Sequence, residues 1–300
     1  MLRAEIFAIT EMRHFELVEP RSLNEACGLL ENNSEAKPVA GGTALLTIIK
    51  QGLLLPKLLV NLKKIRDASD ISFDPEAGLR IGALATINEI ESSPIVREHY
   101  PALADACHVV ANIRIRNMAT IGGNLAHADY QSDPPTVLAA LDARVEIMNT
   151  RGVRTLPLNE FQLGSYDTAL QAGELISALA IPPMPDGMTG LYVKFTTGSS
   201  EERPCAGVAA LARMSNGHCA ELRLAVGAVS SRPLRIAAET LATNQTLTSA
   251  LISTIAAEAA RSIDPIDDVR GPADYKRHLV GVLVRRAISA LAAAKTEKHP

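Results

Sequence analysis

The chain has 300 residues, of which 47% are hydrophobic and 21% charged, as in soluble globular proteins and unlike disordered or collagen-like chains. Its formal net charge of -3 supplies no basic surface for nucleic acid. No apolar run approaches the roughly 20 residues of a membrane-spanning helix. Acidic Glu5 and Glu11 argue against a secretory signal. We therefore expect a cytoplasmic protein with no membrane span and no nucleic-acid partner.

Capping residues and apolar periodicity predict alternating short helices and strands in the first half. Ser22 with Glu25, and Thr86 with Glu89, have the spacing of capping boxes that begin helices. Short apolar runs bounded by proline or glycine predict buried strands on either side of a turn at Asp74-Pro75. The predicted elements are a helix at 22–30, a strand at 37–40, a helix at 44–49, strands at 58–62 and 79–84, and helices at 86–90 and 100–110.

The second half divides at a run of three prolines and a glycine, from Pro182 to Gly187, which predicts a linker. We place the domain boundary there, with one domain at 1–186 and another at 187–300. Asn216-Gly217 is typical of a tight hairpin turn. The predicted elements are a helix at 137–141, strands at 144–148 and 173–181, strands at 192–195, 206–214 and 220–229 in a small sheet, and helices at 247–262 and 272–294.

Four cysteines are scattered without any C-x-x-C pair, which predicts reduced core thiols and neither disulfides nor an iron–sulfur cluster in this chain. His127 and Asp129 have the residue types of a metal pair. No third ligand follows at a usual spacing, so we predict no metal site.

Two glycine pairs are the most informative feature, because consecutive glycines let backbone amides approach an anionic ligand closely. Gly41-Gly42 is followed by Thr43 and a predicted helix, and Gly122-Gly123 lies between Thr120 and Asn124. Each pair can hold part of a diphosphate, and each is equally compatible with an ordinary tight turn. Neither has the G-x-G-x-x-G or G-x-x-x-x-G-K-[ST] pattern, which argues against a Rossmann dehydrogenase and a P-loop nucleotidase.

The surrounding motifs resemble a known family, the medium FAD-binding subunits of carbon monoxide dehydrogenase and related xanthine dehydrogenase-type hydroxylases. The resemblance covers nearly the whole chain, and the order and spacing of the two glycine segments are its most specific marks. The matching segments are Phe15 with Pro20, 38–43, 115–124, 173–176, 202–204, 275–277 and 285–287.

This resemblance implies an α+β fold. Residues 1–186 would form the two-subdomain FAD-binding fold of vanillyl-alcohol oxidase and p-cresol methylhydroxylase. Residues 187–300 would form the family's flavoprotein C-terminal domain, a small antiparallel sheet with helices. The implied cofactor is non-covalent FAD, with its diphosphate and ribityl chain near the two glycine segments. The matching positions are Lys37, Pro38, Val39, Ala40, Gly41, Gly42, Thr43, Ala44 and Leu45, then Ala119, Thr120, Ile121, Gly122, Gly123 and Asn124.

Four further positions match FAD contacts by the same resemblance. Val110 falls where the family packs an apolar residue on the cofactor, and Asp133 where it has an acidic contact to a ribose or ribityl hydroxyl. Asp133 is also placed to cap a helix before Pro134. Ile176 and Lys194 match positions near the flavin ring. The segment 199–203 lacks the aromatic residue that some relatives place near the flavin, so its part in acceptor access is left open.

The implied function is electron transfer within a heteromeric molybdenum hydroxylase. A large molybdopterin subunit and a small subunit with [2Fe-2S] clusters would be the partners, in a dimer of heterotrimers. We name no general base or nucleophile, because redox chemistry belongs to the flavin. Two alternatives are a self-contained flavin oxidase and a cofactor-free scaffold that retains the fold. Substrate, electron acceptor and copy number are not set by this sequence.

Overall fold

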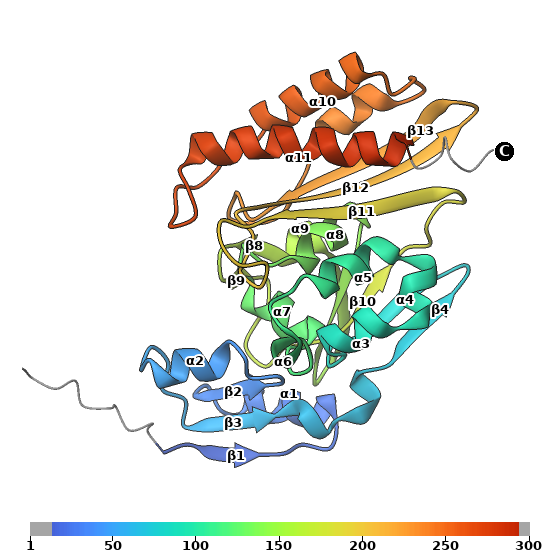
Figure 1. Ribbon diagram of the computed structural model, residues 1–300. Helices are drawn as coiled ribbons and strands as arrows, with labels where there is room; N and C mark the ends of the chain where they lie inside the picture. The colour runs from blue at the N-terminus through green and yellow to red at the C-terminus, as the bar shows by residue number, and fades with distance from the viewer. Residues whose placement is uncertain (1–13, 294–300) are drawn as a thin grey trace, which may run out of the picture.

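The computed structural model describes residues 14–293 and stacks three structural units, as Figure 1 shows from bottom to top. A small α/β unit carries the N-terminal elements. A five-stranded sheet with helices forms the middle, and a second sheet covered by two long helices forms the top. Glu5 and Glu11, on which the expected absence of a secretory signal rests, and Ala294, the expected end of the last helix, lie outside the described residues.

The first unit is a three-stranded parallel sheet in the order β1-β3-β2. Its core packs Ala26 and Cys27 of the first helix against Val60. Ser22 caps that helix as expected, but Glu25 accepts a hydrogen bond from the Arg21 amide, so the expected capping box is wrong in its second half. The elements are β1 (Glu16–Val18), α1 (Leu23–Glu31), β2 (Ala36–Val39), α2 (Leu45–Lys50) and β3 (Leu58–Asn61), followed by the 3-10 helices Leu62–Lys64 and Arg66–Ala68.

The middle unit is built on an antiparallel sheet in the order β4-β5-β10-β6-β7. Thr86 and Glu89 form the full capping box that their spacing predicts. The strands are β4 (Ile71–Asp74), β5 (Gly78–Gly82), β6 (Arg144–Asn149), β7 (Gly152–Pro157) and β10 (Leu175–Ile181), with a hairpin of β8 (Gln162–Gly164) and β9 (Asp167–Thr168). The helices are α3 (Ile87–Ser92), α4 (Pro94–His99), α5 (Pro101–His108), α6 (Ile113–Arg116), α7 (Ile121–His127), α8 (Pro134–Ala140) and α9 (Leu158–Phe161).

The turn at Asp74 joins different strands from those expected. Asp74 accepts hydrogen bonds from the amides of Glu76 and Ala77, and this turn connects β4 to β5. The run at 58–61 lies in the other sheet, beside β1 and β2. Apolar runs therefore identified two strands here but not their partners, and β4 was missed.

The top unit is a four-stranded antiparallel sheet, β11-β12-β13-β14, with α10 and α11 against one face. Asn216 and Gly217 both have positive φ, 50° and 79°, which confirms the hairpin turn. The opposite face contributes Ala209 and Leu211 to the core of the middle unit. The elements are β11 (Met188–Phe195), β12 (Ala206–Ser215), β13 (His218–Gly227), β14 (Leu234–Arg235), a 3-10 helix at Ala237–Ala242, α10 (Ser249–Arg261) and α11 (Ala273–Ala293).

The four cysteines, Cys27, Cys107, Cys205 and Cys219, are all free and buried, which confirms the expectation of core thiols. Among the described residues, no helix combines the length and apolar character needed to cross a bilayer.

Candidate functional site: a cavity between two glycine segments

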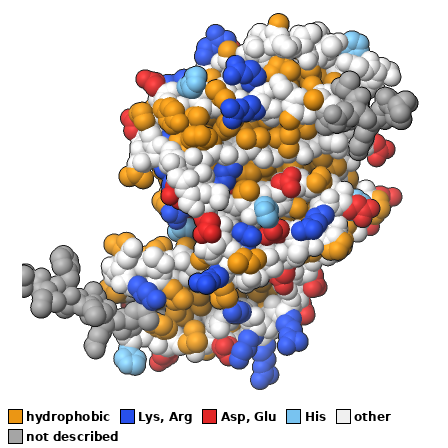
Figure 2. Space-filling model, in the orientation of Figure 1, with side chains coloured by type: hydrophobic (Ala, Val, Ile, Leu, Met, Phe, Trp, Pro, Cys, Tyr) orange, Lys and Arg blue, Asp and Glu red, His pale blue; other side chains and the backbone are white. Residues whose placement is uncertain are grey.

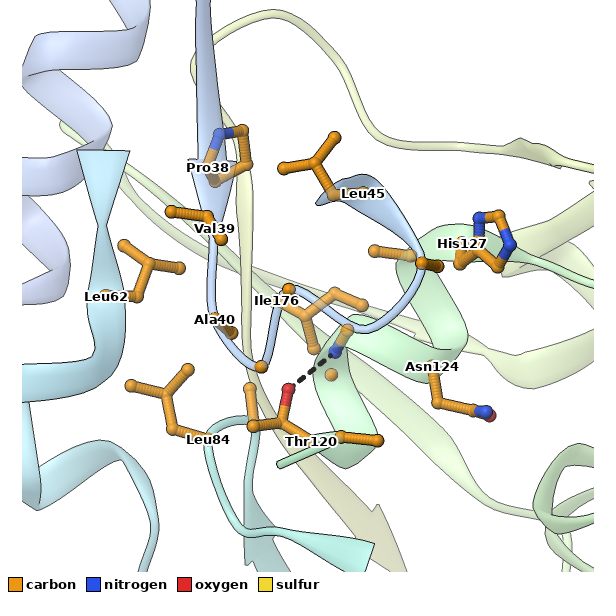
Figure 3. Close-up of a pocket in the computed structure, with 18 of the residues that line it drawn as sticks. Pro38, Val39, Ala40, Leu45, Leu62, Leu84, Thr120, Asn124, His127 and Ile176 are labelled. Carbon is orange, nitrogen blue, oxygen red and sulfur yellow. Dashed lines mark hydrogen bonds between the residues drawn. The ribbon is translucent and has the colours of Figure 1, made fainter. Parts of the chain in front are cut away.

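A cavity of about 350 Å³ lies where the first unit meets the middle unit, and the molecular surface is hollowed at this level on the left of Figure 2. Its volume is within the range of small-molecule pockets, roughly 300–1,000 Å³. Strand β2 and the following loop form one wall, and the start of α7 forms another (Figure 3). Fifteen of the residues proposed from the sequence line it: Lys37, Pro38, Val39, Ala40, Gly41, Gly42, Thr43, Ala44, Leu45, Ala119, Thr120, Gly122, Gly123, Asn124 and Ile176.

The first glycine segment is an open loop between β2 and α2. Gly42 has φ +71°, a left-handed conformation that favours glycine. A Cβ at Gly41 would lie 1.9 Å from the Met118 carbonyl oxygen, so only glycine permits this approach to the chain before α7. Within residues 14–293, the amides of Gly41, Gly42, Thr43 and Ala44 donate to no protein acceptor. These four N–H groups are available to a ligand in the cavity.

The second glycine segment is not a loop but the first turn of α7. Thr120 is the N-cap, and its hydroxyl accepts a hydrogen bond from the Gly123 amide at 3.1 Å, the dashed line in Figure 3. The amides of Ile121 and Gly122 donate to the carbonyls of Ala85 and Ala83. In the structure, the amides of this glycine pair are therefore already used within the protein.

Close packing accounts for the glycine at position 122. A Cβ there would lie 2.6 Å from the Ala83 Cβ and 2.7 Å from the Ala83 oxygen. The helix thus sits directly on the chain that follows β5, and this contact brings α7 to the edge of the cavity.

The walls of the cavity are mainly apolar, with a few polar side chains. Leu62 and Leu84 lie at one end of the labelled residues in Figure 3 and His127 at the other. Burial lowers the pKa of His127, so its imidazole is neutral near pH 7. Glu174 is ion-paired with Arg154 at 2.7 Å, and this hydrogen bond lowers the pKa of the glutamate.

Two of the other proposed residues, Asp133 and Lys194, form a second cluster around the Lys194 ammonium group. Lys194 Nζ lies 3.1 Å from Asp133 Oδ2 and donates to the Val109 carbonyl at 2.7 Å, beside Val110. The Tyr192 hydroxyl donates to Asp133 Oδ1 at 2.9 Å. Burial raises the pKa of Asp133 to about 6, although Lys194 and Tyr192 oppose the shift. This cluster ties β11 of the top unit to α5 and α8.

Asn124 connects the cavity to that cluster. Its side-chain amide exchanges hydrogen bonds of 2.7 and 3.0 Å with the Ser132 hydroxyl, next to Asp133. Ile121, the remaining proposed residue, is fully buried in the core under α7 and does not line the cavity.

The segment 199–203 is fastened to the rest of the molecule by ion pairs. Arg203 Nε lies 2.6 Å from Asp129 Oδ2, and Arg270 Nη1 lies 3.2 Å from Glu202 Oε2. Asp129 is therefore engaged by an arginine, two residues from His127. No group of three possible metal ligands occurs in the described part of the chain.

Sequence reasoning missed several residues of these two groups. Tyr192 carried no motif, and its role depends on a contact between β11 and α8 that no local pattern encodes. His127 follows Gly123 by four residues, so a helix through the second glycine pair would have placed both on one face. The other cavity residues missed were Ile48, Leu62, Ala83, Leu84, Ala126, Leu170, Glu174 and Leu175.

The residues present fit an elongated cofactor with a diphosphate. The loop at residues 41–44 carries this fit, because all four residues line the cavity and their amides have no acceptor within residues 14–293. A Cβ at position 41 would collide with the chain at Met118. Unpaired amides of this kind bind phosphate oxygens. The apolar walls beside them suit an aromatic ring system. Fold and site together define a protein built to hold a nucleotide-type cofactor between two units.

Comparison with known proteins gives the same result. Residues 13–184 match the FAD binding domain in molybdopterin dehydrogenase, and residues 196–291 match the CO dehydrogenase flavoprotein C-terminal domain. The chain is 30% identical to the glyceraldehyde dehydrogenase medium chain of Sulfolobus acidocaldarius, over 93% of this chain and 98% of the relative. It is 32% identical to the carbon monoxide dehydrogenase medium chain of Hydrogenophaga pseudoflava, over 92% and 96%.

A solved structure of carbon monoxide dehydrogenase from the same Hydrogenophaga species superposes with a TM-score of 0.88 at 33% identity, covering 93% of this chain and 97% of that chain. The chain belongs to the family of FAD-binding subunits of molybdenum hydroxylases, as an oxidoreductase component whose cofactor is FAD. The expected mixed α and β fold with a flavoprotein C-terminal domain is confirmed.

Proposed function

We propose that this chain is the electron-transfer subunit of a heteromeric molybdenum hydroxylase. Electrons released at a large molybdopterin subunit reach it through the [2Fe-2S] clusters of a small subunit and leave for an external acceptor. FAD, when bound, supplies the redox chemistry at this junction. The observation that carries the proposal is the cavity with its four unpaired loop amides, in a chain that spans almost the full length of medium subunits.

The protein's own residues bind and orient the cofactor. We propose that the amides of the 40–44 loop hold the diphosphate, and that the cavity-lining positions given above surround the rest. Ile176 and Lys194 would lie near the flavin ring, and Asp133 would contact a ribose or ribityl hydroxyl. Val110 would pack on the cofactor, with Asn124 between the cavity and the cluster. A cation at Lys194 favours negative charge on a nearby ring. None of these residues is assigned an acid–base step.

The assembly and its location are also proposals. The large and small partner subunits would join this chain in a dimer of heterotrimers. Two relatives are named a medium chain and a medium subunit, and these names support the proposal that this chain also has partner subunits. Four free thiols favour a reducing compartment, so we place the complex in the cytoplasm. We place the domain boundary between Asp186 and Gly187, in the segment that joins β10 to β11.

Copurification tests the assembly. A tagged chain pulled from its native host is expected to bring an iron–sulfur subunit and a molybdenum subunit, identified by mass spectrometry and metal analysis. The chain alone is expected to carry non-covalent FAD and to show no hydroxylase turnover. A flavin-loaded monomer that oxidises an organic substrate without iron or molybdenum would establish the oxidase alternative. A chain purified with its partners but without flavin would establish the scaffold.

A further inference from the structure

A second cavity, of about 420 Å³, lies on the other side of the middle unit, where it meets the top unit. We call it the junction cavity. The middle unit contributes the end of α8, the start of β6 and the chain around α9, and the top unit contributes the chain that leads into β14. Its lining residues are Ala139, Asp142, Ala143, Arg144, Pro157, Leu158, Asn159, Gln162, Arg232, Pro233, Leu234 and Arg235.

One of the three lining arginines is fully used by the protein. Arg235 donates to the carbonyls at the end of α8 and lies 2.6 Å from Asp142 and 2.7 Å from Glu239. It belongs to a network in which three arginines face three carboxylates, so the network is electrically balanced. Its members are Arg213, Arg223 and Arg235 with Asp142, Glu221 and Glu239.

The other two arginines have no such balance. Arg232 Nη1 donates to the carbonyls of Asn159 and Gln162, at 2.7 and 3.2 Å. Across the described chain, no carboxylate lies within ion-pair distance of Arg232 or Arg144. The carbonyls fix the Arg232 guanidinium against the wall of the junction cavity without neutralising its charge. Two positive charges are therefore left over.

A buried amide accompanies these charges. Gln162 is only 4% exposed, yet its side-chain amide makes no hydrogen bond to any residue from 14 to 293. Among the described residues, the nitrogen and oxygen of this amide do not belong to the enclosed side-chain atoms that lack a partner, so they keep contact with solvent. Because Gln162 lines the junction cavity, its amide is placed to donate a hydrogen bond to a ligand there or to accept one.

The charges and the size of the junction cavity favour a ligand that joins a doubly negative group to an organic group. Two unbalanced guanidinium groups match a phosphate monoester, which carries close to two negative charges at neutral pH, better than a single carboxylate. The cavity is far larger than a free ion, and its apolar walls include Leu158, Pro157 and Leu234. We propose that the junction cavity binds a phosphate-bearing small molecule, with Arg144 and Arg232 on the phosphate and Gln162 beside it.

Titration calorimetry on the full, FAD-saturated chain tests this assignment, because bound FAD keeps the probes out of the flavin site. The probes are AMP, inorganic phosphate and adenosine at constant ionic strength. We expect saturable binding of AMP, weaker binding of phosphate and none of adenosine. If phosphate binds as tightly as AMP, the ligand is free phosphate, and the proposal of a phosphate-bearing organic molecule is wrong.

Variants locate the binding. Arg232→Gln and Arg144→Gln are each expected to weaken AMP binding at least about tenfold, since each removes a charge-assisted hydrogen bond to the phosphate. Arg151→Gln removes an equivalent exposed charge at the turn between β6 and β7 and is expected to bind as the wild type does. Unchanged flavin content and circular dichroism show that each variant folds. Absence of saturable binding of both AMP and phosphate, or equal binding by all three variants, overturns the proposal.

Discussion

Two segments that look alike in the sequence, 40–44 and 120–124, use their glycines for opposite purposes. In the first, Gly42 adopts a left-handed conformation and the neighbouring amides are left without protein acceptors. In the second, the amides of residues 121–124 are hydrogen-bonded within the protein, and Gly122 allows a helix to touch Ala83. A glycine pair therefore marks close approach of the backbone, and only the hydrogen-bond inventory shows whether a ligand or another part of the chain approaches.

The largest expected effect is loss of the cofactor in Gly42→Val. A β-branched residue is strongly disfavoured at φ +71°, so the loop must change shape and its amides no longer converge. Gly52→Val is the matched control, because Gly52 has the same φ of +71° with no atom within 4 Å of its Cβ position, outside the cavity. The ratio of flavin to protein absorbance is expected to fall to near zero in Gly42→Val only.

Both variants should lose similar stability, about 1–2 kcal/mol, because the backbone strain is the same. Full flavin content in Gly42→Val would remove the first segment from the cofactor site.

The next effect is on folding and concerns Gly122→Ala. The added methyl group collides with Ala83, and we expect the free energy of unfolding to fall by roughly 1–3 kcal/mol. Gly28→Ala makes the same substitution in α1, where the nearest atom is 3.9 Å away, and is expected to gain about 0.5–1 kcal/mol. Urea denaturation of both variants measures the difference. Equal stability of the two would contradict the packing role of the second segment.

The smallest effect is a pH dependence next to the second segment. Burial raises the pKa of Asp133 from 3.8 to about 6, so the folded protein holds this proton more tightly than the unfolded chain does. The stability that this contributes is present below pH 4 and is lost as the pH rises through about 6. Asp133→Asn is expected to flatten the stability profile in that window by an amount on the order of 1 kcal/mol.

Asp167→Asn, which changes an exposed carboxylate on β9, is the control and should keep the wild-type profile. Thermal melts between pH 4 and 7 provide the measurement. An unchanged slope in Asp133→Asn would assign the pH dependence to another group.

Local signals in the sequence predicted local structure well. The capping box at Thr86, the turn at Asn216-Gly217 and the long C-terminal helices need only neighbours along the chain, and each is present. The sequence did not predict which distant strands pair with each other. The run at 58–61 belongs to a parallel sheet with β1 and β2, although its pattern equally suits a partner across the Asp74 turn.

The candidate site shows the same limit. Motif spacing identified the residues of the first loop, because their chemistry is local. The pairing of Asp133 with Lys194 and Tyr192 joins residues about 60 positions apart, and nothing in either segment encodes it. The sequence also did not show that the two glycine pairs differ, since the acceptors at Ala83 and Ala85 come from the turn after β5, more than 30 residues earlier.

The two buried faces of the top sheet determine what happens when the chain is cut between the middle and top units. One of its faces is covered by α10 and α11, and the other shares a core with the middle unit through Ala209, Leu211 and Ala225. Cleavage in the proline-rich segment before β11 would leave two pieces with matching bare apolar walls. Each fragment alone should aggregate, whereas coexpressed fragments should reassemble without a covalent link. The segment between β10 and β11 is thus a natural position at which to divide the chain into two fragments that bind each other.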